Sequence, residues 1–341
     1  MSTAFVLMTA MPPTVGHKAL IEYASLVANN VQVIICTQPG EPFVMGRVDA
    51  LRRAVQRKNI TINHKHRDLP QEPSGNPGFW GMWASFLREY GFRERDFIVA
   101  SEDYGVRLAQ EVNGIFIPFD LERNIVKAKA SMVRENPYLH FKTILPEFRH
   151  NLKKKITIFG AESVGKTTLA KSLAKKLPLA QFYPEWARPY LETVGPDITF
   201  EKMENIWDGQ KALQEFASWN IEEMLSIQDT DLFSTLGYWR MSNQVGQPPN
   251  DLEIDAVNRQ SDLYIMLPST IPFEADPLRY GGDVRETSDR YWIDILTEYD
   301  LPFVVLDGRY PEKWHNLAVA EITELLPLNE NNPLKYTRVG N

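Results

Sequence analysis

The sequence lacks several features that define whole classes of protein. Its 341 residues include one cysteine, Cys36, which excludes a disulfide scaffold and a cysteine-built zinc site. Its apolar runs, such as Val31–Cys36, are far shorter than the roughly 20 residues that span a membrane. Residues 1–13 carry no lysine or arginine, so we expect no signal peptide. We therefore expect a soluble, cytoplasmic protein with no membrane partner.

Positive charge is not in excess either. The chain has 37 Lys and Arg against 44 Asp and Glu, a formal net charge of −7. A general nucleic-acid binder carries the opposite balance, so we expect no nucleic-acid partner. What the chain does have is an ordinary globular composition, with 43% hydrophobic residues, and enough length for two domains.

Short apolar strands alternate with amphipathic helices in two successive stretches of the chain. In the first half we expect strands at 4–8, 31–36, 60–63, 96–100 and 114–118, with helices at 18–27, 48–57, 80–90 and 106–112. Residues 120–150 are expected to be helical, and the run Lys153–Lys155 is interpreted as solvated charge before a strand. A second α/β unit starts at Ile156–Phe159. This pattern predicts an α/β protein with parallel sheets, divided into 1–150, 151–330 and a loose tail at 331–341.

A phosphate-binding turn opens the second unit. Residues 160–167 match G-x-x-x-x-G-K-[ST] after an apolar strand and before a helix. Its glycines let backbone N–H groups converge on phosphate, Lys166 would reach the β- and γ-phosphates, and Thr167 would ligate Mg²⁺. The predicted nucleotide-binding residues are Gly160, Ala161, Glu162, Ser163, Val164, Gly165, Lys166, Thr167 and Thr168.

Acids and arginines after this turn supply candidates for phosphoryl transfer. Asp229 and Asp231 follow the apolar stretch 224–227, where a carboxylate can hold Mg²⁺ or accept a hydroxyl proton. Glu185 and Arg188 are expected near the same sheet edge. Arg279 lies in an arginine-rich segment that could cover a triphosphate as a lid. A helix cap for the aspartates, a surface ion pair and a solvated loop are the corresponding structural alternatives.

A second phosphate signature follows the first strand of the chain. Thr14-Val-Gly16-His17 is the [HT]-x-G-H turn of nucleotidyltransferases, in which Gly16 admits an α-phosphate and His17 donates a hydrogen bond to it. Residues 128–134 resemble the second phosphate clamp of these enzymes, with Ser131 as the hydroxyl and Arg134 as the arginine for the β- and γ-phosphates of ATP. The structural alternatives are a histidine that only caps the helix and a segment 128–134 with no phosphate role.

The two signatures in this order resemble the NadR-type bifunctional enzymes of NAD salvage. Similarity is clearest at 133–138 and 158–166, and it continues through the acidic and arginine motifs above. The resemblance implies a Rossmann-like nicotinamide mononucleotide adenylyltransferase domain followed by a P-loop ribosylnicotinamide kinase domain. It implies that Asp229 binds the ribose and activates its 5′-hydroxyl. Met8, Thr14 and Lys129 depart from the usual family residues.

The resemblance also implies the ligands. They are ATP with Mg²⁺, nicotinamide mononucleotide, ribosylnicotinamide and NAD, with Trp80 stacking on the pyridine ring. Arg47 is a candidate for holding substrate phosphate. The structural alternatives are a core position for Trp80 and a solvated arginine for Arg47. The chain looks like a phage version without the helix-turn-helix segment of the enterobacterial members. A homo-oligomer is possible. The alternatives are a kinase of another nucleoside or nucleotide fused to a degenerate or cytidylyltransferase-like domain, and an NAD- or ATP-sensing regulator.

Overall fold

The protein, seen in a computed structural model, divides into two compact units. Unit 1 is Met1–Asn151 with Pro327–Asn341, and unit 2 is Leu152–Leu326. The structure describes residues 2–67, 69–70, 73–242, 245–274, 285–327 and 332–334, with the backbone alone at 285–287. Each unit is an α/β layer structure around its own parallel sheet, which confirms the predicted fold class.

Unit 1 contains a five-stranded parallel sheet in the order β3-β2-β1-β4-β5. Its strands are β1 (Thr3–Met8), β2 (Asn30–Thr37), β3 (Ile60–His66), β4 (Phe97–Ala100) and β5 (Ile115–Pro118). They are connected by α1 (Val15–Val27), α2 (Val44–Ala54), α3 (Phe79–Glu89) and α4 (Tyr104–Glu111). The strand order reverses beside β1, and ligands of such sheets bind beyond the carboxyl ends of the strands at that point.

Alternating strand residues place the core of unit 1. Phe5 of β1 and Ile34 of β2 point to the same face, where they pack with α3 and α4 around Trp83. The expected continuous helix over 120–150 is wrong. The structure has only α5 (Ala130–Glu135) and α6 (Pro146–Arg149) with two 3₁₀ turns there, because prolines at 137 and 146 interrupt regular hydrogen bonding.

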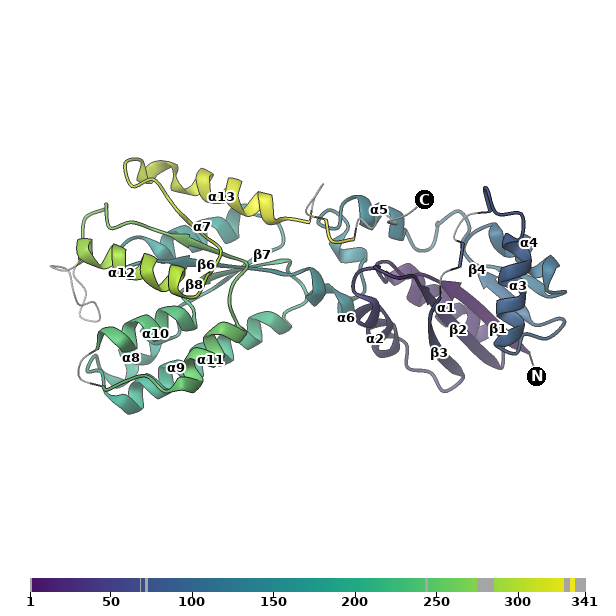
Figure 1. Cartoon of the computed structure of the whole chain (residues 1–341), viewed down its shortest axis with the longest axis horizontal. Helices are drawn as coiled ribbons and strands as arrows, with labels where there is room; N and C mark the ends of the chain where they lie inside the picture. The colour runs from purple at the N-terminus through teal and green to yellow at the C-terminus, as the bar shows by residue number, and fades with distance from the viewer. Residues whose placement is uncertain are drawn as a thin grey trace. The chain divides into compact units, whose positions relative to one another are not determined.

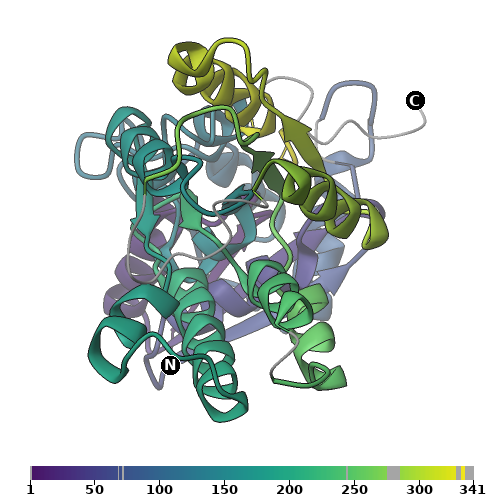
Figure 2. The ribbon, with the colours of Figure 1, turned by 90° about the vertical axis from the view of Figure 1, so that its left-hand side faces the viewer.

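Unit 2 repeats the design with the strand order β10-β9-β6-β8-β7. Its strands are β6 (Lys154–Phe159), β7 (Ala180–Tyr183), β8 (Leu225–Asp229), β9 (Leu263–Met266) and β10 (Phe303–Val305). Its helices are α7 (Lys166–Lys176), α8 (Ala187–Val194), α9 (Phe200–Trp219), α10 (Leu232–Met241), α11 (Asn250–Asn258), α12 (Arg285–Glu298) and α13 (Trp314–Leu325). Helices α7 and α13 cover one face, and α8 to α11 cover the other (Figures 1 and 2). The strand order reverses beside β6, the strand before the phosphate-binding turn.

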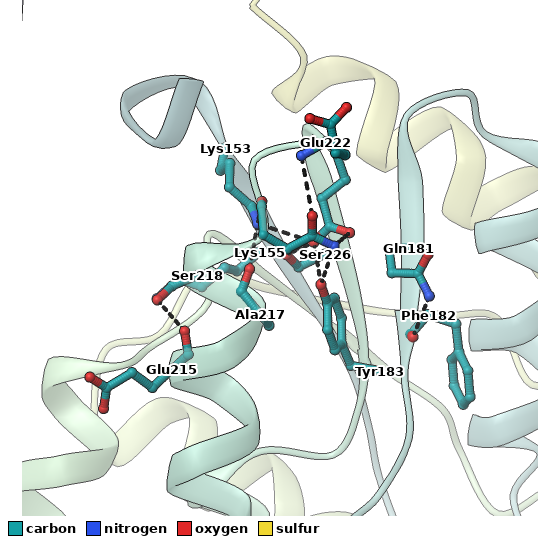
Figure 3. A network of polar contacts seen from close by, with 12 residues as sticks. Lys153, Lys155, Gln181, Phe182, Tyr183, Glu215, Ala217, Ser218, Glu222 and Ser226 are labelled. Carbon is teal, nitrogen blue, oxygen red and sulfur yellow. Dashed lines mark hydrogen bonds and ion pairs between the residues drawn. The ribbon is translucent and has the colours of Figure 1, made fainter. Parts of the chain in front are cut away.

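A buried polar network corrects the interpretation of Lys153 as solvated charge. Its side chain is only 6% exposed, and its ammonium donates to the carbonyls of Ala217 and Asn220 and pairs with Glu223 at 3.1 Å. The hydroxyl of Tyr183 donates to the same Glu223 carboxylate at 2.7 Å (Figure 3). The Lys153 ammonium therefore donates hydrogen bonds to carbonyl groups at the carboxyl end of α9. No following turn of the helix provides N–H donors for these carbonyls.

Two residues of the expected loose tail are packed into unit 1. Asn332 and Leu334 are buried there, at 3% and 0% exposure. The Asn332 side-chain amide donates to the carbonyl of Arg134 at 2.5 Å. This contact holds the helix that carries Arg134, a link that polarity alone did not predict.

We predict that Gly209→Ala destabilises the protein. Alanine normally stabilises a helix interior over glycine, but a Cβ at Gly209 of α9 would lie 2.1 Å from the Trp186 ring. The ring or the helix must move, and overpacking of this kind costs about 1–3 kcal/mol. Urea unfolding followed by tryptophan fluorescence measures the change.

Gly81→Ala is the matched control. A Cβ on Gly81 of α3 would meet no other described atom within 4 Å, so alanine there should add about 0.5–1 kcal/mol of stability. Equal effects at both positions would contradict the assigned Trp186 contact.

Candidate active sites

The phosphate-binding turn of unit 2 has the backbone that its glycines were expected to supply. Gly160 has a φ of +131°, and a Cβ there would lie 2.7 Å from the carbonyl oxygen of Leu267. Gly165, the N-cap of α7, has a φ of +89°. Ser163 between them also has a positive φ, of 59°. The turn delivers the N-terminus of α7, with its free N–H groups and positive dipole end, to the carboxyl edge of the sheet.

The side chains of Lys166 and Thr167 form hydrogen bonds with different partners. The Lys166 ammonium is buried and donates to the carbonyls of Gly160 and Ala161, at 3.0 and 2.7 Å. The Thr167 hydroxyl donates to Oδ2 of Asp229, at 2.5 Å. Val164 is fully buried, so only its backbone can meet a ligand. Thr168 lies exposed in the first turn of α7.

Asp229 completes a setting that fits Mg²⁺. Its Oδ1 is buried and has no hydrogen-bond partner among the described residues, while Oδ2 lies against the Thr167 hydroxyl. Burial raises the pKa of Asp229, and the positive charge of Lys166 opposes that rise. Mg²⁺ binds through one or two protein oxygens together with substrate phosphates. A hydroxyl and an unsatisfied carboxylate oxygen beside a phosphate-binding turn meet that requirement.

A pocket opens beside the turn, against α8, α9 and α10. It is lined by Glu162, Glu185, Ala187, Arg188, Leu191, Pro196, Ile198, Met203, Ile206, Gln210, Thr230, Ser234, Thr235, Tyr238 and Ser242. The structure thus brings Glu185 and Arg188 to one pocket together with the turn residue Glu162. Hydroxyl and amide groups share the lining with apolar side chains, a mixture suited to a polar small molecule.

Glu185 has the pKa of a proton acceptor that works near neutral pH. Burial raises the pKa of this carboxyl to about 7, and the negative charges of Glu162 and Asp229 raise it further. The cations Lys166 and Arg188 oppose the shift. A carboxyl with a pKa near 7 that lines a pocket is a candidate functional group and not a surface ion pair.

Asp231 corrects the expectation that it binds substrate. It is 1% exposed and caps α10, accepting from the Ser234 N–H at 3.1 Å and from the Tyr264 hydroxyl at 2.7 Å. Burial raises its pKa to about 6. Both carboxylate oxygens are used inside the fold, so Asp231 positions the helix that carries Ser234 and Tyr238. The predicted lid residue Arg279 lies outside the described residues.

In unit 1, the turn after β1 forms a capping box. Thr14 is the N-cap of α1, its side chain bonds the N3 backbone, and Nδ1 of His17 accepts from the Thr14 N–H at 3.0 Å. Since Nδ1 accepts, the ring proton of neutral His17 lies on Nε2. A Cβ on Gly16 would lie 3.0 Å from the Ala128 carbonyl oxygen, so the backbone is closely approached here.

His17 is neutral at physiological pH. Burial lowers the pKa of its imidazole to about 4, and the positive charges of Arg123 and Arg134 lower it further. The Arg134 guanidinium donates to the carbonyl of Met11 at 2.7 Å, which places it beside the same turn. A neutral imidazole donor and a guanidinium at a helix N-terminus together suit a phosphate group.

Other predicted residues of unit 1 are placed less directly. Ser131 is half-buried in the first turn of α5, on the same helix as Arg134, and Lys129 is exposed at its N-cap. Trp80 is partly buried and packs edge-on against Phe79 at 4.9 Å. The core of unit 1 therefore covers only part of the Trp80 indole, and the rest of the ring is exposed.

Arg47 is not the solvated arginine that was the alternative to a substrate contact. It is 0% exposed, pairs with Glu41 at 2.6 Å and donates to the carbonyl of Thr9 at 3.2 Å. Its two terminal nitrogens are engaged in these contacts, while Nε is buried with no hydrogen-bond partner among the described residues. It holds the chain just before the Thr14 turn.

Sequence reasoning missed residues that only the fold brings to the sites. Thr230 lines the pocket with a φ of +70°, and Tyr238 and Gln210 face the same space. The position of Thr230 between two candidate acids was a usable signal. Arg123, whose charge acts on His17, lies in no recognisable motif.

Two features are absent from the part of the chain that the structure describes. None of its described helices is both long and apolar enough to cross a membrane. Among the same residues, no group of three or more His, Cys, Asp or Glu side chains is arranged to hold a metal ion.

Comparison with known proteins gives consistent relatives. An AAA domain family model matches residues 155–313. The trifunctional NAD biosynthesis/regulator protein NadR of Escherichia coli K12 is 28% identical over 318 residues, which cover 86% of this chain and 76% of the relative. The NadR protein of Salmonella typhimurium LT2 is 27% identical over 329 residues, covering 88% and 78%.

A solved structure extends the likeness to the fold of the whole chain. The crystal structure of a NadR protein in complex with NAD and AMP-PNP matches with a TM-score of 0.67 and 20% identity, covering 100% of this chain and 98% of that one. At this identity the match concerns the fold alone. The sequence relatives, the shared fold and the phosphate-binding turn agree with one another. The chain is therefore a homologue of the NadR proteins, with a P-loop domain in its second half that matches the AAA domain model.

Proposed function

We propose that this protein is a bifunctional enzyme of NAD salvage. Unit 2 would phosphorylate ribosylnicotinamide with ATP, and unit 1 would adenylylate the resulting nicotinamide mononucleotide to NAD with release of pyrophosphate. The observation that carries the proposal is the presence of a separate phosphate turn at the reversal point of each sheet, in a homologue of NadR. A NadR protein has been crystallised with NAD and AMP-PNP, and another with NR, which supports these ligands.

In unit 2, phosphoryl transfer would use the groups around the turn. The backbone N–H groups and Lys166 would bind the ATP phosphates, and Thr167 with Asp229 would hold Mg²⁺, which when bound offsets phosphate charge. The 5′-hydroxyl of the nucleoside would attack the γ-phosphorus, the bond to the β-phosphate oxygen would break, and ADP would leave. We assign the hydroxyl proton to Glu185 rather than Asp229, because Glu185 lines the pocket and Asp229 faces Thr167.

In unit 1, the turn would stabilise charge on an attacked α-phosphate. The mononucleotide phosphate would attack that phosphorus while pyrophosphate leaves, with no covalent enzyme intermediate. Nε2–H of His17 would donate to the α-phosphate, and Arg134, with Ser131 beside it, would bind the β- and γ-phosphates. Trp80 would stack on the pyridinium ring, and Arg47, which donates to the Thr9 carbonyl, would hold the chain that leads into the turn.

Product analysis tests the whole proposal. Purified protein incubated with ATP, Mg²⁺ and ribosylnicotinamide should form the mononucleotide first and NAD later, with pyrophosphate in amounts equal to NAD. Parallel reactions with CTP and with other nucleosides separate the rival substrate classes. Tight NAD binding with neither product formed, even at high protein concentration, would instead support a ligand-sensing regulator.

We predict that the kinase step depends on pH through Glu185. Its pKa of about 7 means that the carboxyl is protonated below that value and cannot accept a hydroxyl proton. The kcat/KM for the nucleoside should thus rise about tenfold per pH unit below pH 7 and level off above it. Glu185→Gln should lower the rate by about 100-fold or more and remove this limb.

Glu192→Gln is the control for that profile. Glu192 lies in α8, the helix that follows Glu185, where it is 58% exposed and 3.9 Å from Arg188. The variant should keep both the rate and the limb. A limb that persists in Glu185→Gln would assign the titrating group elsewhere.

A further inference from the structure

The connection between β5 and α5 is an organised loop. Both oxygens of Asp120 accept backbone N–H groups, from Ile125 at 3.0 Å and from Val126 at 2.7 Å. These bonds lower the pKa of Asp120, which favours its charged form. Arg123 stands within the loop with a φ of +56°. Since the loop is tied back on itself, the position of Arg123 is set by the fold.

Arg123 extends to the phosphate turn of unit 1. Its Nη1 donates to the carbonyl oxygen of Ala128 at 3.2 Å. That same oxygen lies where a Cβ on Gly16 would approach it to 3.0 Å. The guanidinium, the carbonyl and the glycine of the turn are therefore consecutive neighbours. The charge of Arg123 also acts on His17, more strongly than that of Arg134.

The partner of Arg123 is easily exchanged. Its Nη2 lies 3.4 Å from the Glu102 carboxylate, with side chains 27% and 56% exposed. An ion pair this long and this exposed contributes little to stability. The Glu102 charge acts on Arg134 as well. The Glu102 carboxylate thus offsets positive charge on both Arg123 and Arg134 beside the turn. A bound polyanion would offset the same two charges.

We propose that Arg123 is a second arginine for the triphosphate bound by unit 1, and that it exchanges Glu102 for phosphate oxygens when the nucleotide binds. The inference rests on the proposed nucleotide site of unit 1. A triphosphate carries more charge than Arg134 alone can offset. A guanidinium reaching over Gly16 from the opposite loop would give phosphate oxygens a second forked donor.

The test measures nucleotide binding to unit 1 separately from nucleotide binding to the P-loop of unit 2. In protein labelled with ¹³C-histidine, the ring signal of His17, assigned by its loss in His17→Asn, is followed during titration with α,β-methylene ATP, which cannot be cleaved at the α–β link. Arg123→Gln should weaken the affinity about tenfold or more, because a charge-assisted bond is lost. Glu102→Gln should tighten it. Without nucleotide, Arg123→Gln should raise the pKa of His17.

Arg107→Gln is the matched control, since Arg107 pairs with Glu111 at 2.6 Å on the surface of α4. It should bind like the wild type. Arg123→Gln binding within twofold of the wild type would overturn the inference, even if the protein makes NAD. If Arg123→Gln does not fold, an unchanged affinity in Glu102→Gln overturns it. If the variants show these affinity changes but the wild-type protein makes no NAD, the proposed function is refuted and the arginine assignment stands.

Discussion

Lys166→Ala is expected to lower phosphorylation of ribosylnicotinamide by at least about 100-fold, while conversion of nicotinamide mononucleotide to NAD continues at the wild-type rate. The ammonium is buried and held at the phosphate turn by the carbonyls of Gly160 and Ala161. A positive group fixed at that place offsets charge on the transferring phosphoryl, and removing one such group costs about this much. Separate assays of the two steps on one preparation measure both rates.

Lys175→Ala provides the comparison. Lys175 lies exposed in the last turn of α7, away from the turn that begins the helix. Its loss should change neither rate. If Lys166→Ala also stops NAD formation in a folded protein, the assignment of the two reactions to separate units is wrong.

His17→Ala is expected to have the opposite effect, with adenylyl transfer lowered by about 100- to 1,000-fold and nucleoside phosphorylation unchanged. Nδ1 of the ring is occupied by the Thr14 N–H, so Nε2–H is the group that can donate to an α-phosphate. A donor preorganised at a buried helix N-terminus contributes on this scale. Pyrophosphate release with ATP and nicotinamide mononucleotide is the measurement.

The pH dependence sharpens this second result. Because the pKa of His17 is about 4, the ring stays neutral from pH 5 to 9, and adenylyl transfer should show no histidine limb in that range. His315→Ala, on α13 of unit 2, serves as the control and should leave both activities unchanged. A limb near pH 6.5 that disappears in His17→Ala would contradict the assigned neutral ring.

Much of the fold could be predicted from local sequence. The strand expected at 156–159 lies within Lys154–Phe159, and the helix after it begins at Lys166, as the glycine pattern required. A strand, a glycine turn and a helix N-terminus are decided by neighbouring residues, because the positive φ of Gly160 and Gly165 is a property of the turn itself. The turn at Thr14 could be recognised for the same reason, because its motif ends at His17, only three residues later.

Local sequence could not predict which charged side chains are buried or which residues they contact. Arg47 and Asp231 look like ligand-binding groups in sequence, yet one is enclosed with Glu41 and the other with Tyr264, 33 residues away. Helix boundaries near 120–150 were wrong because prolines and long-range packing, rather than polarity, decide that region. Charged residues of the same type are solvated or buried according to elements distant in the chain.

The sequence by itself determined that the chain has two α/β units, each with one candidate phosphate turn, because both are encoded over a few adjacent residues. Only the tertiary structure decided which charges lie beside those turns. It gave Glu185 a pKa near 7 by burying it beside other acids, and it brought Arg123 to the Ala128 carbonyl that closely approaches Gly16, more than a hundred residues away in the chain. Desolvation and Coulomb interaction depend on distance in space, and that distance exists only once the chain is folded.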